Sequence, residues 1–181
     1  MKPFIETRSG LSFWPLKPKV GDILIGDIAH ALANQCRFSG HTLYHYSVAQ
    51  HSVGVSQLLD REGYSQVIQM WGLLHDASEA YLVDLPSPLK RHAGFAYYKT
   101  AEKRLMHAVC RRFDFPLKEP EAVRWADAVL LACEARDVMP FRKEHWSKLE
   151  EKPDPSILIT KWTPEFARER FLVRYRALKE I

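Results

Sequence analysis

The chain has 181 residues, of which 46% are hydrophobic and 27% charged, and its formal net charge is 26 − 22 = +4. This composition is ordinary for one soluble globular domain and excludes a disordered or disulfide-stapled chain. The three cysteines form no close pair, and no apolar run approaches the ~20 residues of a membrane span, so we expect buried thiols in a cytoplasmic protein. The small positive excess could favour phosphate-bearing ligands, but solubility explains it equally well.

The first quarter of the chain predicts an irregular segment. Prolines and Ser9-Gly10 interrupt it, and the short extended pieces 11–14 and 23–25 could pair as a small hairpin. Asp27 is then typical of an N-cap, and the apolar residues after it predict a short helix that ends near Cys36. Residues 37–41 follow as a predicted loop.

From Ser47 onward the apolar residues recur at helical spacings of three and four. The pattern predicts helices over residues 47–63, 65–82, 95–113 and 121–138. The second is apolar around most of its circumference, which indicates a buried central helix, and the prolines of 84–88 must end it. Thr163-Pro164 opens a terminal helix over about 163–181, as an N-cap followed by proline. The fold class is therefore all-α, in a single domain spanning residues 1–181.

Histidines and acids interrupt these apolar helices, and four of them are candidate metal ligands: His51, His75, Asp76 and Asp127. A buried carboxylate without a partner is costly, so it normally finds a cation. Two imidazoles with two carboxylates suit Mn, Fe, Co, Ni, Zn or Mg, and the absence of thiolates argues against a closed structural zinc site. Glu79 lies one turn beyond His75 and Asp76 on the same helical face, where a carboxylate could take a proton from water.

Each of these residues also has a simpler interpretation. A single histidine such as His51 is more often hydrogen-bonded in the core, and Asp127 or Glu79 alone would be an ordinary solvated acid. The ordered combination of His, then His-Asp, then Asp favours the metal site. The nearby His41 and His45 are interpreted as exposed loop residues rather than as further ligands.

Four stretches carry a resemblance to a known family: Arg37-Phe38, Val48-Ala49-Gln50-His51-Ser52, His75-Asp76-Ala77-Ser78-Glu79-Ala80 and Asp84-Leu85-Pro86-Ser87-Pro88-Leu89-Lys90. Over about residues 25–140 the chain resembles the HD-domain phosphohydrolase superfamily. More narrowly, it resembles the small deoxynucleotide-hydrolysing branch, which includes bacterial 5′-deoxynucleotidases and compact phage dATP triphosphohydrolases. The resemblance implies an HD-type helical bundle that forms a homo-oligomer.

The resemblance also implies roles for single residues. His51, His75, Asp76 and Asp127 match the positions that hold a divalent metal ion such as Mn, Co, Zn or Mg. Glu79 matches the acid that orients or deprotonates the attacking water. Asp84 falls where related proteins contact the sugar or complete the polar shell of the site.

Three further positions match substrate contacts in this family. Arg37 and Lys90 fall near the phosphates, although Arg37 could instead cap a helix C-terminus and Lys90 could be simply solvated. Phe38 stands where related nucleotidases often carry tryptophan. An aromatic ring there could still stack on a base or pack against a sugar.

The sequence thus predicts a deoxynucleotide phosphohydrolase. The favoured interpretation is a dNTP triphosphohydrolase that prefers dATP and releases nucleoside and triphosphate. A 5′-deoxynucleotidase acting on dNMPs is the alternative within the same class, and a metal-bound regulatory module without turnover is the alternative of another class. The basic segment 168–176 could bind nucleic acid, but its periodicity favours an amphipathic helix that packs on the domain or on another subunit. We expect no membrane contact.

Overall fold

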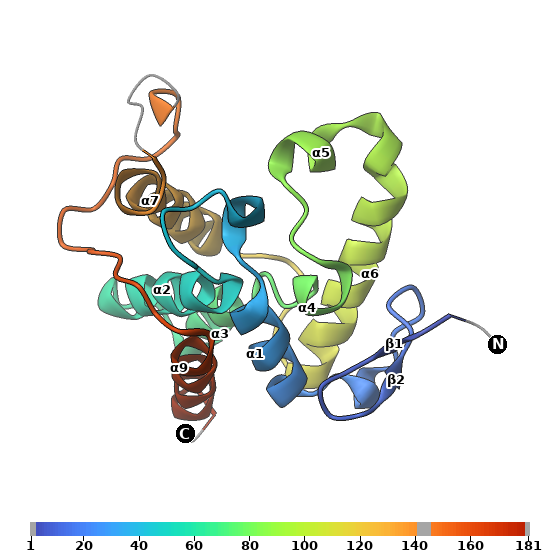
Figure 1. Cartoon of the computed structure of the whole chain (residues 1–181). Helices are drawn as coiled ribbons and strands as arrows, with labels where there is room; N and C mark the ends of the chain where they lie inside the picture. Colours follow the sequence, from blue (N-terminus) through green and yellow to red (C-terminus); the bar gives the residue numbers. More distant parts are fainter. Residues whose placement is uncertain (1–2, 141–145, 180–181) are drawn as a thin grey trace.

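The computed structural model describes residues 3–140 and 146–179 and confirms the all-α fold class (Figure 1). Its α-helices are α1 (Ile25–Asn34), α2 (Val48–Arg61), α3 (Gln66–Leu74), α4 (Glu79–Leu82), α5 (Ser87–Arg91), α6 (Ala96–Phe113), α7 (Glu121–Asp137) and α9 (Pro164–Ala177). Three 3-10 turns join them: η1 (Val20–Asp22), η2 (Arg37–Gly40) and η3 (Ala93–Phe95). Helix α2 is central and packs against α1, α3, α7 and α9, whereas α5 and α6 lie on the other side of α4.

Side-chain hydroxyls cap two helix starts, of which the cap at Thr163 was predicted and the cap at Ser47 was not. The Ser47 hydroxyl accepts a hydrogen bond from the Gln50 amide at 3.1 Å, and the Thr163 hydroxyl accepts one from the Phe166 amide at 3.2 Å. Each cap satisfies an amide that the first helical turn leaves without a partner. Pro164 occupies the first turn of α9, where a missing amide proton costs nothing.

The close packing of α2 on α3 depends on Gly72. A Cβ at that position would lie 2.5 Å from Leu59 Cδ1 and 3.2 Å from Val55 Cγ1, so no other residue fits without movement. Residues 69–74 of α3 are all buried, which confirms the prediction of a central buried helix. This contact sets the distance between His51 on α2 and His75, which directly follows α3.

The N-terminal hairpin is formed by segments other than the predicted pair. Strand β1 (Ile5–Glu6) pairs antiparallel with β2 (Ser12–Phe13), with Ile5 opposite Phe13, so the prediction that 11–14 pairs with 23–25 is wrong. Residues 7–11 close the hairpin locally, through the Thr7 amide and the Leu11 carbonyl at 2.9 Å. Ile23 is instead fully buried in the core.

The prediction that Asp27 is an N-cap is also wrong, because α1 begins two residues before Asp27 and Leu24 is the N-cap. The buried Asp27 carboxylate accepts hydrogen bonds from the Ser9 amide at 2.9 Å and from the Ser9 hydroxyl at 2.7 Å. It therefore ties the hairpin to α1 instead of capping the helix. The predicted loop at 37–41 contains the short η2, in which Phe38 and Ser39 have left-handed backbone angles.

The predicted helix over 65–82 is two helices. Helix α3 ends at Leu74, and α4 begins at Glu79. Between them the backbone tightens to hydrogen bonds spanning three residues, from the Ala77 amide to Leu74 and from the Glu79 amide to Asp76. This turn carries His75 and Asp76, and apolar periodicity alone does not reveal it. The short helix α5, inside the segment expected only to interrupt the chain, was also not predicted.

In residues 3–140 and 146–179, no helix combines the length and the apolar character needed to cross a membrane. Among the cysteines, Cys110 and Cys133 are buried and Cys36 is partly exposed, and all three are free thiols.

Candidate metal centre

Three of the four predicted ligands meet in one group. The His51 and His75 Nε2 atoms lie 3.2 Å apart, and the Asp76 Oδ2 atom lies 3.2 Å from His75 Nε2 and 3.9 Å from His51 Nε2. One ligand atom from each of the three side chains lies within 4.8 Å of the other two. The group contains two imidazoles and one carboxylate, a donor set that suits a divalent metal ion.

The hydrogen bonds on the far side of each ring fix which nitrogen faces the group. His75 Nδ1 lies 2.8 Å from the Gly72 carbonyl oxygen, which can only accept, so Nδ1 carries the proton. His51 Nδ1 lies 2.6 Å from Glu134 Oε1 and donates to that carboxylate in the same way. In their neutral forms both rings therefore direct the lone pair of Nε2 into the group, as metal-binding histidines do.

Glu134 is a residue of the candidate site that the sequence analysis missed. It is fully buried on α7 and joins two parts of the site, because its second oxygen accepts from Arg37 Nη2 at 3.0 Å. Burial alone would raise the pKa of Glu134, but Arg37 and His51 outweigh it and hold this pKa below its ordinary value. A signal was present in the sequence, since Glu134 follows Asp127 by seven residues, two helical turns along one face.

Asp127, the fourth predicted ligand, lies at the margin of the group. Its Oδ1 atom is 3.1 Å from His51 Nε2, and the side chain is more exposed than that of Asp76. Burial would raise the pKa of Asp127, but the hydrogen bond with His51 and the charges nearby lower it to about 2. The structure thus places Asp127 beside the ligands, and its role as a ligand stays a prediction.

The electrostatic balance of the group favours a cation. Asp76, Asp127 and Glu134 contribute −3 and Arg37 contributes +1, so the formal charge with neutral imidazoles is −3 + 1 = −2. Burial would lower the pKa of His75, yet the Asp76 carboxylate and Asp127 raise it to about 10. The field that attracts a proton to this imidazole would equally attract a metal ion, and a dication would neutralise the group.

Two relatives match almost the whole chain. The uncharacterized protein YfdR of Escherichia coli (strain K12) is 37% identical over 179 residues, which cover 98% of this chain and 97% of YfdR. An uncharacterized protein of Rhodobacter capsulatus is 35% identical over 175 residues, which cover 90% of this chain and 89% of that protein. The chain belongs to the YfdR family. No family model matches it.

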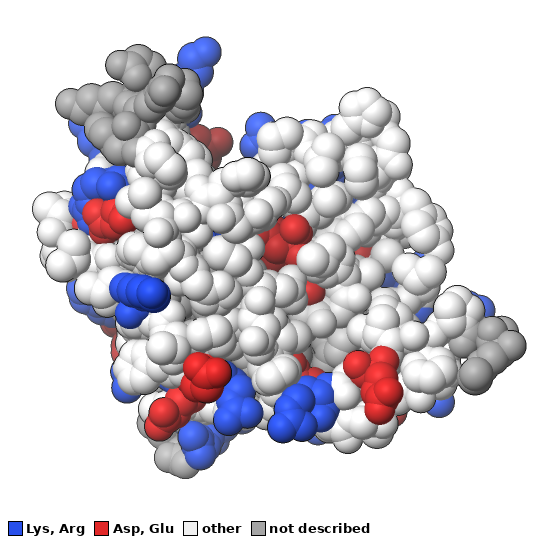
Figure 2. Space-filling model, viewed as in Figure 1, with Lys and Arg blue, Asp and Glu red and all other residues white. Residues whose placement is uncertain are grey.

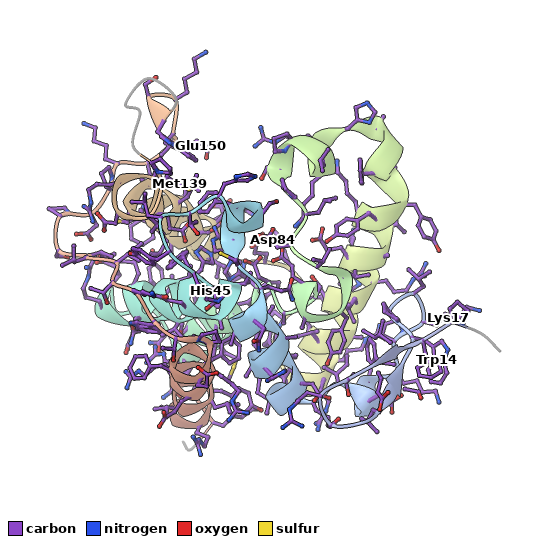
Figure 3. The ribbon with its side chains drawn as sticks, viewed as in Figure 1. Trp14, Lys17, His45, Asp84, Met139 and Glu150 are labelled. Carbon is purple, nitrogen blue, oxygen red and sulfur yellow. The ribbon has the colours of Figure 1, made fainter. Side chains whose placement is uncertain are left out.

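Within the His51-His75-Asp76 group, which we call the metal group, Asp76 lines a cavity of about 630 Å³. Its walls come from η2, α4, α5 and α7 and include seven predicted site residues: Arg37, Phe38, Asp76, Glu79, Asp84, Lys90 and Asp127. His51 and His75 lie behind this wall. Figure 3 shows Asp84 near the centre of the view, where Figure 2 shows acidic atoms recessed among uncharged neighbours.

Glu79 is buried beside the cavity and has one engaged oxygen. Its Oε1 atom accepts from Lys90 Nζ at 3.0 Å, while Oε2 is buried with no hydrogen-bond partner in the described parts of the chain. Burial and the neighbouring Asp76 raise the pKa of Glu79 to about 9, although Lys90 opposes this shift. Lys90 also contacts Glu102 at 2.7 Å. Burial would lower the pKa of Lys90, but the carboxylates of Glu79 and Glu102 raise it and keep the amine charged.

Arg37 lines the cavity but is already paired. Its guanidinium contacts Glu134 at 3.0 Å and Asp76 at 3.6 Å, while Nε is buried with no hydrogen-bond partner among the residues described. These contacts place Arg37 against the metal group. It follows α1 in sequence, but its guanidinium is held by carboxylates of the site, which differs from the alternative of a helix cap.

The backbone that carries Asp84 is held by Gln35, a residue that the sequence analysis did not identify. Gln35 Nε2 donates to the Glu79 carbonyl at 3.0 Å, and the Asp84 amide donates to Gln35 Oε1 at 3.1 Å. Between these points Val83 has φ 68° and ψ 151°, a conformation that a β-branched residue adopts only at a cost. Burial raises the pKa of Asp84, which faces the cavity.

Two aromatic side chains form one edge of the cavity. The rings of Phe38 and Trp146 meet edge to face, with centroids 6.1 Å apart, and the Arg37 guanidinium lies 5.5 Å from the Phe38 centroid. Trp146 was not predicted, because its approach depends on the path of the chain after α7. The left-handed backbone at Phe38 is a further strained position that borders this cavity.

The other candidate residues lie elsewhere. His41 is exposed, and His45 hydrogen-bonds to the Ala33 carbonyl at 3.1 Å, and neither lines the cavity. The C-terminal segment forms α9, which packs on α1 and α2 with Phe171 fully buried. Arg174 donates to Ser56 and Gln69 there, so packing on the domain is confirmed for this helix.

Proposed function

We propose that this chain is a divalent-metal-dependent phosphohydrolase of the HD-domain type that acts on deoxynucleotides. One observation carries the proposal: Asp76 of the His51-His75-Asp76 group and the buried, half-engaged carboxylate of Glu79 line the same cavity. A divalent ion held by this group would supply Lewis acidity to a phosphoryl oxygen and acidify a water molecule. Asp127 would complete the ligand set.

Glu79 would act as the general base. Its free Oε2 atom can accept the proton of the attacking water, while Lys90 holds Oε1 and fixes the orientation of the carboxylate. In the metal-free chain burial raises the pKa of Glu79 to about 9, so the carboxyl holds a proton at neutral pH. A dication bound beside Asp76 would lower this pKa, and the deprotonated carboxylate could then accept the proton of water. A metal site without turnover would need no such acid beside it.

Arg37, Lys90 and Asp84 would position the substrate. Arg37 and Lys90 bring positive charge to the cavity wall, where it would stabilise the phosphoryl oxygens as the bond to phosphorus breaks. Asp84 faces the same space and could accept a hydrogen bond from a sugar hydroxyl. Phe38 and Trp146 offer aromatic surfaces on which a base could pack.

We favour a deoxynucleoside triphosphate, with dATP preferred, as the substrate. Arg91 lines the cavity beyond Lys90 and is exposed, and within the described ranges it forms no ion pair. It is therefore free to receive outer phosphates. Attack at the α-phosphorus would give nucleoside and triphosphate.

A 5′-deoxynucleotidase acting on dNMPs is the second candidate. The observation in its favour is that Lys90 lies between Glu79 and Glu102, at 3.0 and 2.7 Å, so much of its charge is already compensated. A cavity with fewer free cations suits one phosphate better than three. Hydrolysis would then release inorganic phosphate.

A product-resolved nucleotide screen tests this proposal. Metal-stripped protein is resupplied separately with Mn, Co, Zn or Mg and offered each dNTP, NTP and dNMP, with Glu79→Gln as the matched control. Nucleoside plus intact triphosphate from a dNTP, lost in E79Q with metal content retained, is the expected result. Phosphate from dNMPs alone would move the assignment to a deoxynucleotidase. Absence of turnover with every metal would contradict both and favour a regulatory metal site.

A further inference from the structure

A second hollow, of about 750 Å³, lies between residues 16–20 and one face of α6. It shares no lining residue with the cavity of the candidate metal centre. The α6 residues that line it are spaced by three and four, so they form one stripe along the helix: Thr100, Lys103, Arg104, His107, Ala108 and Arg111. Lys17 comes from the opposite wall.

Two contacts hold the walls of this hollow together. Arg104 Nη1 donates to the Leu16 carbonyl at 2.9 Å, and η1, which follows the 16–20 wall, packs on α6. Lys17 therefore faces α6 across a defined space (Figure 3 shows Lys17 on the hairpin side of the molecule). The hollow is a product of the fold, and its cations approach from two directions.

The charge of the hollow is uncompensated. Lys17, Lys103, Arg104 and Arg111 line it, no acidic residue does, and none of these four forms an ion pair with any other described residue. Their combined +4 equals the net charge of the whole chain, so the remaining 22 basic and 22 acidic residues balance. The cavity of the metal centre differs, since its three cations share the lining with four acids: Asp76, Glu79, Asp84 and Asp127.

We propose that this hollow binds a compact polyphosphate anion, either inorganic or as part of a nucleotide. Like charges gathered in one concave space repel one another, and a polyvalent anion relieves this repulsion. Lys103 and Arg111 are eight residues apart, about 12 Å along the helix axis, which exceeds the reach of a single phosphate. Arginine forks can bind phosphate oxygens in pairs, and His107 adds a ring nitrogen. Because the cations lie on two facing walls, they can surround a compact anion, whereas an extended nucleic-acid strand would contact only some of them.

The direct test is titration of ¹⁵N-labelled protein with sodium tripolyphosphate, in EDTA so that no metal complex forms at the other site. We expect saturable amide shifts within 16–20 and 100–111. The variant K103E/R111E changes two exposed side chains and should bind about tenfold more weakly or worse, whereas K161E/R168E, with two exposed cations elsewhere, should bind as wild type does. Unchanged thermal unfolding would show that the variants remain folded.

Three outcomes would overturn the proposal. The first is no saturable binding, and the second is binding with shifts confined to the cavity of the metal centre. The third is equal affinity in wild type and K103E/R111E. A parallel titration with dATP in EDTA separates the two sources of polyphosphate, because tighter binding of dATP than of tripolyphosphate at residues 16–20 and 100–111 would assign the hollow to a nucleotide. Binding of single-stranded oligodeoxythymidylate but not of tripolyphosphate would overturn the proposal in favour of nucleic acid. Nucleotide turnover does not enter this test, so it stands apart from the proposed function.

Discussion

Glu134 determines how His51 faces the metal group. It is fully buried and holds both His51 Nδ1 and Arg37, so its removal would leave two buried polar groups without a partner. We expect Glu134→Gln to weaken metal binding by about 10–100-fold, as loss of a partner behind a ligating histidine typically does. Glu134→Ala should also lower the free energy of unfolding by about 3 kcal/mol or more.

Metal titration and urea unfolding measure these two effects separately. Glu150→Gln, a change in a loop after α7 at a residue that contacts neither His51 nor Arg37 in the structure, serves as the control. Unchanged metal affinity in E134Q would mean that the His51–Glu134 contact does not orient the ligand.

Glu79 should make stability depend on pH in a defined direction. Its pKa in the folded protein, about 9, lies above the ordinary 4.5, so the folded state binds this proton more tightly than the unfolded state does. The corresponding stability is fully present below about pH 4.5 and is lost as the pH rises towards 9. Metal-free Glu79→Gln should therefore gain stability relative to wild type across this range, by about 1 kcal/mol or more at its upper end.

Urea unfolding of both proteins at several pH values, in EDTA, tests this sign. If the unfolding free energy of wild type instead rises relative to that of E79Q as the pH rises, the prediction is wrong. Lys90 would then lower the pKa of Glu79 by more than burial raises it, and Glu79 would be an ordinary ion-paired acid. If E79Q is both more stable and inactive, burial of the Glu79 carboxylate lowers stability for the sake of function, as is common for buried catalytic carboxylates.

The candidate ligands of the His51-His75-Asp76 group could be predicted from the sequence because each has a local signal. His75 and Asp76 follow a buried apolar run, and His51 interrupts another, so burial of these groups was foreseeable. Gln35 and Trp146 have no such signal, since their roles depend on which backbone segments the fold brings together. Glu134 lies between these cases, because its position two turns beyond Asp127 was visible but its partners were not.

At the scale of elements, the contact between α2 and α3 controls the geometry of the centre. Gly72→Ala would place a methyl group 2.5 Å from Leu59 Cδ1, and the Gly72 carbonyl also orients His75. We expect a loss of about 1–3 kcal/mol in unfolding free energy, as overpacking usually costs, together with weaker metal binding.

The matched control is Gly26→Ala, which lies inside α1 with nothing within 4 Å of the added Cβ. This change should stabilise the protein by about 0.5–1 kcal/mol, because alanine is the better helix former. Equal effects of the two substitutions in urea unfolding would contradict the close contact between α2 and α3.

The long helices were predictable and the short elements were not. Periodicity and capping located α2, α6, α7 and α9 because each has enough turns to repeat its pattern. The break at 75–78 contains neither proline nor glycine, and it follows from tight turns that periodicity does not register. The hairpin was assigned the wrong second strand because segments of two residues carry almost no pattern.

At the scale of the whole molecule, α9 completes the core. Phe171 is fully buried against the domain, whereas Phe166 on the same helix is 44% exposed. Phe171→Ala should cost about 3–5 kcal/mol, and Phe166→Ala should cost far less. Thermal and urea unfolding of the two variants measure the difference, and equal small effects would mean that α9 is a dispensable appendage. Homo-oligomerisation remains a prediction.

The account as a whole depends on the metal centre, and titration of metal-stripped protein with Co²⁺ tests it most directly. Wild type should bind the ion saturably, His75→Ala should lose that binding, and the exposed His41→Ala should retain it. Binding that survives in His75→Ala, or its absence from wild type, would contradict a metal centre formed by His51, His75 and Asp76.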